Sequence, residues 1–233
     1  MNYIIYKLYN KMFSALILVF IINIFGLISY ILNRNFLDIN KYLNDCKIIV
    51  IGDSLGTGYG LDNKDDIWVN KLKNRFLSFY EDYNIINFSK NDRTTDEALP
   101  IVEKSLLVDP DVIIIMLGGN DVLQNLSIRN MKNNFKKMIE MCLERCIEVI
   151  FVGIPIPFKM KEEKGWTNEY MEEYVQTFYQ ISEEYDVIFV KDFLEMSEGN
   201  MKRYFLDDNI HVNSDGQELI SDIIFNYIIK NDL

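Results

Sequence analysis

The sequence predicts an α/β domain, built as a three-layer αβα sandwich around a five-stranded parallel sheet and preceded by one transmembrane helix. Two observations predict this architecture. A charge-free apolar run occupies residues 12–32, and beyond residue 45 short apolar segments rich in β-branched residues alternate with segments of helical spacing. Of the 233 residues, 49% are hydrophobic and 25% are charged, a composition that suits one hydrophobic core and excludes a disordered chain.

The amino-terminal run has the length of a membrane-spanning helix. At about 1.5 Å per residue, residues 12–32 cover roughly the 30 Å hydrocarbon layer of a bilayer. A cleaved signal peptide is the alternative, but the run is longer than the apolar region of such peptides, and residues 29–34 contain no small-x-small site. We therefore expect a short tail at 1–11, a signal-anchor helix at 12–32, a linker at 33–45 and a domain at 46–233.

Charge indicates the orientation of this anchor and excludes one class of partner. Two lysines and the amino terminus precede the span, whereas the two basic residues after it are offset by Asp38 and Asp45. This bias predicts a cytoplasmic amino terminus and an extracytoplasmic domain. The net charge of the chain is −11, which repels a phosphate backbone and argues against a nucleic-acid partner.

Few residues suited to metal binding or disulfide formation are present. The chain has one histidine, which excludes a multi-histidine metal centre. Its three cysteines contain no CxxC pair and fit neither a zinc site nor a disulfide framework. We expect no metal ion and no organic cofactor.

The elements expected in the domain alternate between strand and helix. Strands are expected at 46–52, 84–88, 111–117, 147–154 and 186–193, and helices at 67–80, 95–107, 131–146, 168–185 and 214–229. Right-handed crossovers between parallel strands favour the order 2-1-3-4-5 of flavodoxin-like sheets. In this order a ligand site lies at the carboxyl ends of strands one and three, where the strand order reverses.

The first polar segment at this edge is the glycine-rich turn after strand one. Glycines at 52, 56, 58 and 60 allow a tight turn, so that Ser54 stands at the end of the strand near backbone amides. A phosphate-binding loop is the alternative, but the turn lacks the lysine of a P-loop and the GxGxxG pattern of dinucleotide sites. Ser54 is therefore a candidate nucleophile.

Two further polar segments supply partners for such a nucleophile. Asn120 follows strand three, where its amide can donate to an oxyanion, although a turn with a helix cap is the simpler explanation for it alone. His211 lies three residues after Asp208, just before the last helix, where Ser214 and Gln217 have capping-box spacing. Each segment alone fits a structural role, but together they hold the nucleophile, base, carboxylate and oxyanion donor of a serine hydrolase.

With these segments identified, the sequence resembles the SGNH, or GDSL, hydrolase superfamily over residues 47–229. The motif GDSL stands at 52–55, GxND at 118–121 and DxxH at 208–211, in the order of that family. Three motifs in the same order make the resemblance specific. It implies the expected sandwich fold, hydrolysis of an ester through an acyl-serine, and no cofactor.

The resemblance also implies a role for individual residues. The implied catalytic residues are the nucleophile Ser54, the base His211 and the orienting carboxylate Asp208. The implied oxyanion donors are the amides of Ser54 and Asp92 and the side chain of Asn120. The implied substrate-binding residues are Asp53 and Gly118.

One motif of the family is altered. The stretch usually written NxGxSGxT stands at 87–94, and Asp92 occupies the place of the glycine whose amide helps to bind the oxyanion. The amide survives this substitution. A carboxylate there can repel the oxyanion and lower the rate, unless Arg93 or solvent screens it or the side chain points away.

The leading hypothesis is a membrane-anchored serine esterase that forms an acyl-Ser54 intermediate. Its substrates would be small-molecule or lipid esters, such as lysophospholipids, acyl thioesters or O-acetylated sugars. One alternative is an O-acyltransferase with the same triad. Another is a ligand-binding domain whose catalysis is impaired by Asp92.

Overall fold

The computed structural model describes residues 46–79, 83–156, 158–195, 198–208, 210–231 and 233. The tail, signal-anchor helix and linker expected at 1–11, 12–32 and 33–45 lie outside these residues. Among the helices within the described ranges, none combines the length and apolar character that a membrane span requires.

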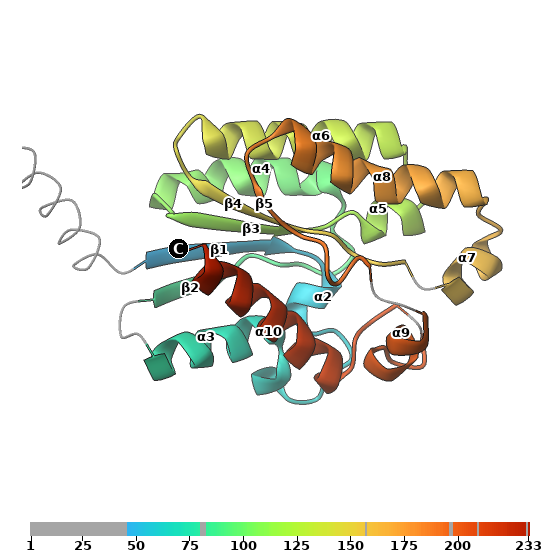
Figure 1. Cartoon of the computed structure of the whole chain (residues 1–233), viewed down its shortest axis with the longest axis horizontal. Helices are drawn as coiled ribbons and strands as arrows, with labels where there is room; N and C mark the ends of the chain where they lie inside the picture. Colours follow the sequence, from blue (N-terminus) through green and yellow to red (C-terminus); the bar gives the residue numbers. More distant parts are fainter. Residues whose placement is uncertain (1–45, 80–82, 157, 196–197, 209, 232) are drawn as a thin grey trace, which may run out of the picture. The chain divides into compact units, whose positions relative to one another are not determined.

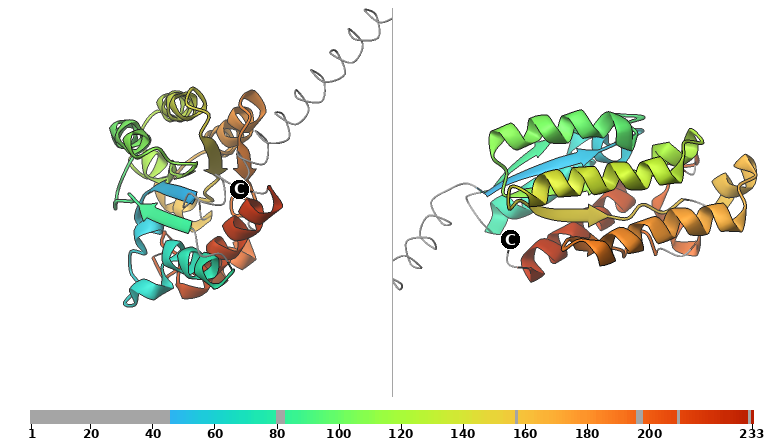
Figure 2. Two further views of the ribbon diagram at one scale, coloured as in Figure 1. Left: turned by 90° about the vertical axis from the view of Figure 1, so that its left-hand side faces the viewer. Right: turned by 90° about the horizontal axis from the view of Figure 1, so that it is seen from above.

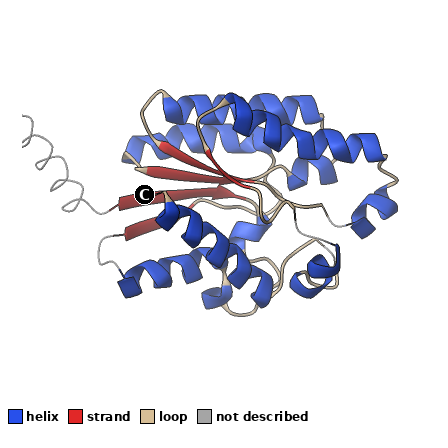
Figure 3. Cartoon of the chain, in the orientation of Figure 1, coloured by secondary structure: helices blue, strands red, loops and turns tan. Residues whose placement is uncertain are grey.

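The described residues form the predicted five-stranded parallel sheet, drawn in red in Figure 3. Its strands are β1 (Cys46–Gly52), β2 (Tyr83–Asn87), β3 (Val112–Met116), β4 (Glu148–Val152) and β5 (Ile188–Val190). Their order is β2-β1-β3-β4-β5, which confirms the predicted order. Gly52 pairs with Met116 across β1 and β3, so the segments that follow these two strands begin at the same level of the sheet.

Helices cover both faces of the sheet (Figures 1 and 2). On one face lie α3 (Trp68–Phe79) and α10 (Ser214–Lys230), and on the other lie α4 (Thr95–Ser105), α6 (Ile128–Leu143) and α8 (Asn168–Glu184). Successive residues of β1 contribute to both hydrophobic clusters. Ile48 and Val50 pack with α3 and α10, whereas Ile49 and Ile51 pack with α4, α6 and α8. Burial of both faces explains why the strands read as continuous apolar runs.

The expected boundaries differ from the structure mainly at α6. The helix predicted at 131–146 begins earlier, because the side chain of Ser127 accepts a hydrogen bond from the amide of Asn130 and caps it. It ends at Leu143, and Cys146 follows in the left-handed region with φ 57°. The predicted extension of this helix to Cys146 is therefore wrong.

The last strand is shorter than predicted. Residues 186–193 were expected to form it, but β5 spans only Ile188–Val190 and pairs with β4 alone. Phe193 and Leu194 follow in a turn and still reach the core, where both are buried. The apolar run therefore indicates which residues are buried, but the hydrogen-bonded pairing of β5 with β4 ends before the run does.

The expected capping box at α10 is also wrong. Asn213, rather than Ser214, caps this helix, since its side chain accepts a hydrogen bond from the amide of Gly216 at 2.9 Å. Gln217 is buried and turned into the domain.

The sequence did not predict the short helices, because segments of so few residues are too short to show a helical period. They are α2 (Ser54–Thr57), α5 (Gly119–Leu123), α7 (Phe158–Lys164) and α9 (Glu198–Tyr204). Two of them, α2 and α5, directly follow β1 and β3, and they carry the candidate site.

Candidate active site

Ser54 is the first residue of α2, at the carboxyl end of β1. Asp53 caps this short helix, since its carboxylate accepts a hydrogen bond from the amide of Leu55 at 3.0 Å. Ser54 is 7% exposed and lines a cavity. The amide of Ser54 belongs to the first turn of a helix, where amides have no intrahelical acceptor. The residue thus offers a hydroxyl and an amide at one point of the sheet edge.

Asp208 and His211 form a hydrogen-bonded pair in the loop before α10. The Asp208 Oδ2 atom lies 2.7 Å from Nδ1 of His211, and Oδ1 accepts the amides of Ile210 and His211 at 2.9 and 3.0 Å. Burial acts to raise the pKa of Asp208, but these hydrogen bonds outweigh it and lower the pKa below its ordinary value. The carboxylate is therefore ionised at neutral pH, and it leaves Nε2 as the imidazole nitrogen that can exchange a proton.

Asn120 lies on α5 beside Asp53, the cap of α2. Its side-chain amide donates to Oδ2 of Asp53 at 3.2 Å and to the carbonyl of Arg93 at 3.3 Å. The side chain lines the same cavity as Ser54. The structure thus brings together Ser54 and Asn120, as predicted from the level ends of β1 and β3.

Asp92 lies in a tight turn at the edge of this site. The turn is closed by a hydrogen bond of 3.3 Å from the amide of Arg93 to the carbonyl of Lys90. Asp92 has φ 59°, in the left-handed region that favours glycine, which agrees with its place in the altered motif. The residue is exposed and does not line the cavity that holds Ser54. Water therefore screens its charge.

Arg93 is buried, in contrast to its neighbour. It is 6% exposed, and its guanidinium donates to the carbonyls of Gly52, at 3.3 Å, and of Phe88. It ties the ends of β1 and β2 together and carries a positive charge near Asp53. The hydrogen bonds of Arg93 thus go to the strand ends. Screening of the Asp92 carboxylate is therefore left to solvent.

The two predicted substrate-binding residues differ in placement. Asp53 lines the cavity, whereas Gly118 does not, and the neighbouring Gly119 does. A Cβ atom at Gly118 would lie 3.2 Å from both Met131 and Phe135. Gly118 thus faces the core under α6.

Asp53 combines deep burial with a carboxyl group. Burial raises its pKa to about 7, and the neighbouring Asp121 adds to this, while the bond from the Leu55 amide and the charge of Arg93 act in the opposite direction. The group thus changes its ionisation near neutral pH, directly behind the candidate nucleophile.

Asp121 is a structural residue that the sequence left unassigned. It is buried and accepts hydrogen bonds from the amide and hydroxyl of Thr95 at 2.9 and 2.6 Å. Burial raises its pKa. Asp121 therefore fastens α5 to the start of α4 and fixes the element that presents Asn120.

The cavity at Ser54 is small and largely apolar. Its volume is about 30 Å³. The lining residues are Asp53, Ser54, Leu55, Gly119, Asn120, Leu123, Ile154, Pro155, Ile156 and Ile210. Sequence reasoning missed the contribution of the segment after β4, since residues 147–154 were expected to continue as strand. Pro155 was the available signal that the chain leaves the sheet here, because a central strand does not accommodate proline.

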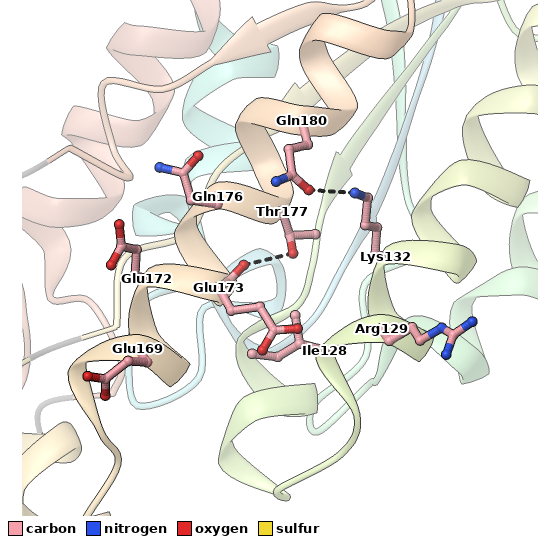
Figure 4. Close-up of a pocket in the computed structure, with 9 residues that line it drawn as sticks. All are labelled: Ile128, Arg129, Lys132, Glu169, Glu172, Glu173, Gln176, Thr177 and Gln180. Carbon is pink, nitrogen blue, oxygen red and sulfur yellow. Dashed lines mark hydrogen bonds between the residues drawn. The ribbon is translucent and has the colours of Figure 1, made fainter.

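A larger hollow of about 490 Å³ lies between α6 and α8 (Figure 4). Glutamate side chains dominate its α8 side, and Lys132 donates a hydrogen bond to Gln180 across it. The hydroxyl of Thr177 donates to the carbonyl of Glu173 within α8. This hollow contains neither a serine nor a histidine, so the catalytic candidates lie elsewhere.

Within the residues that the structure describes, no three side chains of His, Cys, Asp or Glu are grouped to hold a metal ion. The candidate chemistry is carried by the side chains and amides named above.

Known proteins match most of this chain. Residues 50–219 match the model of the GDSL-like lipase/acylhydrolase family. An arylesterase of Vibrio mimicus is 25% identical over 188 residues, covering 79% of this chain and 89% of that protein. The esterase TesA of Pseudomonas aeruginosa is 26% identical over 165 residues, covering 70% of this chain and 78% of that protein.

A solved structure extends the likeness to three dimensions. The psychrotrophic esterase EstA from Pseudoalteromonas sp. matches with a TM-score of 0.68 and 24% identity, covering 80% of this chain and 98% of that chain. At this identity the likeness concerns the fold. The range matched by the family model contains Ser54, Asn120 and the Asp208–His211 pair.

Proposed function

The chain belongs to the GDSL-like lipase/acylhydrolase family and is a carboxylic ester hydrolase, and from this premise we propose that Ser54, His211 and Asp208 are its catalytic triad. The observation that carries the proposal is the 2.7 Å contact between Asp208 and Nδ1 of His211. It fixes the tautomer in which Nε2 can accept a proton. Ser54 supplies the hydroxyl, in a cavity that also holds Asn120.

The reaction proceeds through an acyl-enzyme. Oγ of Ser54 attacks the ester carbonyl while Nε2 of His211 takes its proton, and the protonated imidazole then gives that proton to the departing alcohol. Water attacks the acyl-Ser54 with His211 again as the base, and the imidazolium returns the proton to Oγ of Ser54 as the bond to the acyl group breaks and the carboxylic acid leaves. Asp208 stays ionised throughout and stabilises the imidazolium, as its lowered pKa supports.

Three donors are suited to the oxyanion. They are the amides of Ser54 and Asp92 and the side-chain amide of Asn120. The bonds of Asn120 to Asp53 and Arg93, at 3.2 and 3.3 Å, are long for such contacts, so one of its protons can turn to the oxyanion at little cost. Asp92 is exposed and lies outside the cavity lining. Solvent therefore screens its carboxylate from the oxyanion, which favours catalysis over a binding-only role.

The acyl group is short in this proposal. A cavity of about 30 Å³ lined by Ile154, Pro155 and Ile156 accommodates little more than one water-sized group. This small space favours an acetyl group over longer acyl groups. Residues 12–32 anchor the enzyme as a single-pass helix with the domain outside the cytoplasm, as the charge-free apolar run supports.

The test is hydrolysis of nitrophenyl acetate, butyrate and octanoate by the full chain in detergent micelles. We expect the acetate to have the highest kcat/KM. Replacement Ser54→Ala should abolish turnover and fluorophosphonate labelling, whereas Ser78→Ala, at an exposed serine of α3, should change neither. Asp92→Gly should alter turnover by less than about threefold, because solvent screens the carboxylate.

Other outcomes separate the alternatives. Hydrolysis that survives Ser54→Ala would exclude Ser54 as the nucleophile. A preference for octanoate would contradict the short acyl group. Diversion of the acetyl group from free acid to an added sugar acceptor would assign an O-acyltransferase, and activity that appears only in Asp92→Gly would assign an impaired binding domain.

A further inference from the structure

An exposed tyrosine lies against the ring of the catalytic histidine. The ring centroids of Tyr59 and His211 are 4.4 Å apart, and the ring planes are inclined by 37°. Tyr59 is 52% exposed, whereas the side chain of His211 is 15% exposed. The phenol therefore covers part of an imidazole that Asp208 holds at a single ring nitrogen.

The backbone of Tyr59 is tied to the nucleophile. Its amide donates to the carbonyl of Ser54 at 3.1 Å, and so does the amide of Gly58, which ends α2. Gly58 has φ 68°, and a Cβ atom there would lie 2.4 Å from Ile67. The turn therefore requires glycine, and its geometry sets the position of Tyr59 relative to Ser54.

The next residue packs against the segment that carries the histidine. Gly60 also has a positive φ, 84°, and a Cβ atom there would lie 2.7 Å from Leu206. The amide of Leu206 donates to the carbonyl of His211 at 2.7 Å. The turn at 58–60 thus contacts both the nucleophile and the base segments.

From these contacts we propose that Tyr59 is a positioning residue for His211. Its ring restricts rotation of the imidazole, so that Nε2 remains available to Ser54 while Asp208 holds Nδ1. The aromatic face also favours the imidazolium that forms when Ser54 gives up its proton. This inference rests on the proposed function, in which His211 is the base.

The experiment compares Tyr59→Phe and Tyr59→Leu with the wild-type full chain, using nitrophenyl acetate across pH. Tyr59→Leu should lower kcat about 5- to 30-fold with little change in KM, because a ring contact to a cation contributes about that factor. It should also move the acid limb of the kcat/KM profile to lower pH, since the protonated imidazole loses a favourable contact. Tyr59→Phe keeps the ring and should stay within about twofold of wild type.

The matched control is Tyr185→Leu. Tyr185 caps the carboxyl end of α8, and its hydroxyl donates to Glu140. This variant should leave kcat and the acid limb unchanged. Thermal unfolding of all variants shows that the comparison is made on folded protein.

Defined results overturn the inference. Unchanged kcat and acid limb in Tyr59→Leu would exclude positioning, and a rise in KM alone would make Tyr59 a substrate contact instead. An equal loss in Tyr59→Phe would assign the effect to the hydroxyl.

The proposed function can fail separately, and this failure is recognised by activity that survives Ser54→Ala. His211 is the only histidine of the chain, so untagged protein gives one imidazole Hε1 signal by NMR. In the Ser54→Ala background, a Tyr59→Leu substitution that leaves this signal and its pH response unchanged would contradict the positioning contact without any reference to catalysis.

Discussion

At the scale of single residues, Asp53 connects the stability of the domain with its site. It is the cap of α2, it accepts a hydrogen bond from the side-chain amide of Asn120, and the residue is 3% exposed. Burial raises its pKa to about 7. A carboxyl whose pKa is raised in the folded state binds its proton more tightly there than in the unfolded chain, and this binding stabilises the fold at low pH.

The raised pKa of Asp53 therefore predicts that the free energy of unfolding falls between about pH 4 and pH 8. The contribution is complete below the ordinary pKa of 3.8 and is lost as the pH rises through about 7, a change of about 4 kcal/mol. The free energy of unfolding from urea titrations should therefore fall over this range by more in the wild type than in Asp53→Asn, which has no proton to lose.

The comparison of slopes isolates Asp53 from the other carboxyl groups. Asp109→Asn provides a control, because Asp109 is exposed, and its stability curve should parallel that of the wild type. Parallel curves for Asp53→Asn and the wild type would contradict the raised pKa.

At the scale of elements, Gln217 joins three segments that are distant in sequence. It lies in the first turn of α10 and is 1% exposed. Its Oε1 atom accepts the amide of Trp68 at 2.8 Å, and its Nε2 atom donates to the carbonyl of Leu55 at 3.2 Å. One side chain therefore holds together the start of α3, the helix α2 and α10.

Replacement Gln217→Ala should lower the free energy of unfolding by about 1–3 kcal/mol, because it leaves a buried amide and a buried carbonyl without their partners. It should also reduce kcat for the acetate ester, since Leu55 follows Ser54, the proposed nucleophile. Urea unfolding and steady-state kinetics measure the two effects. Gln176→Ala, at an exposed position of α8, should change neither, and an unaffected Gln217→Ala would contradict the linking role.

At the scale of the whole molecule, the length of β1 lies between the first described residue, Cys46, and the candidate site at Ser54. β1 begins at Cys46 at one edge of the sheet, and Ser54 lies at the opposite edge, where the carboxyl ends of the strands meet. The apolar run at 12–32 precedes the domain in the sequence. Its proposed role as an anchor is a property of the full chain and is tested there.

The full chain should stay with membranes after an alkaline carbonate wash. Substitution of both Phe20→Lys and Ile22→Lys should release it, because each lysine near the centre of a span costs about 2.5–3.5 kcal/mol on insertion. Immunoblotting of pellet and supernatant measures the partition. Lys7→Gln, outside the run, is the control, and wild-type protein in the supernatant would contradict the anchor.

The sequence by itself determined the order of the sheet and the identity of the main polar residues. Runs such as 46–52 and 111–117 are apolar because their strands are buried on both faces, and this pattern is local. The positions of Ser54, Asn120 and His211 follow from motifs that lie at strand ends or in the loop before the last helix. Such features need no knowledge of distant contacts.

Only the tertiary structure decided how these residues act on one another. The pKa of Asp53, the exposure of Asp92 and the contact of Tyr59 with His211 depend on segments far apart in the chain. The link through Gln217 and the cavity wall at Ile154 and Pro155 are of the same kind. Burial and hydrogen bonding depend on which groups surround a side chain after packing, and a pattern of neighbours in sequence carries no such information.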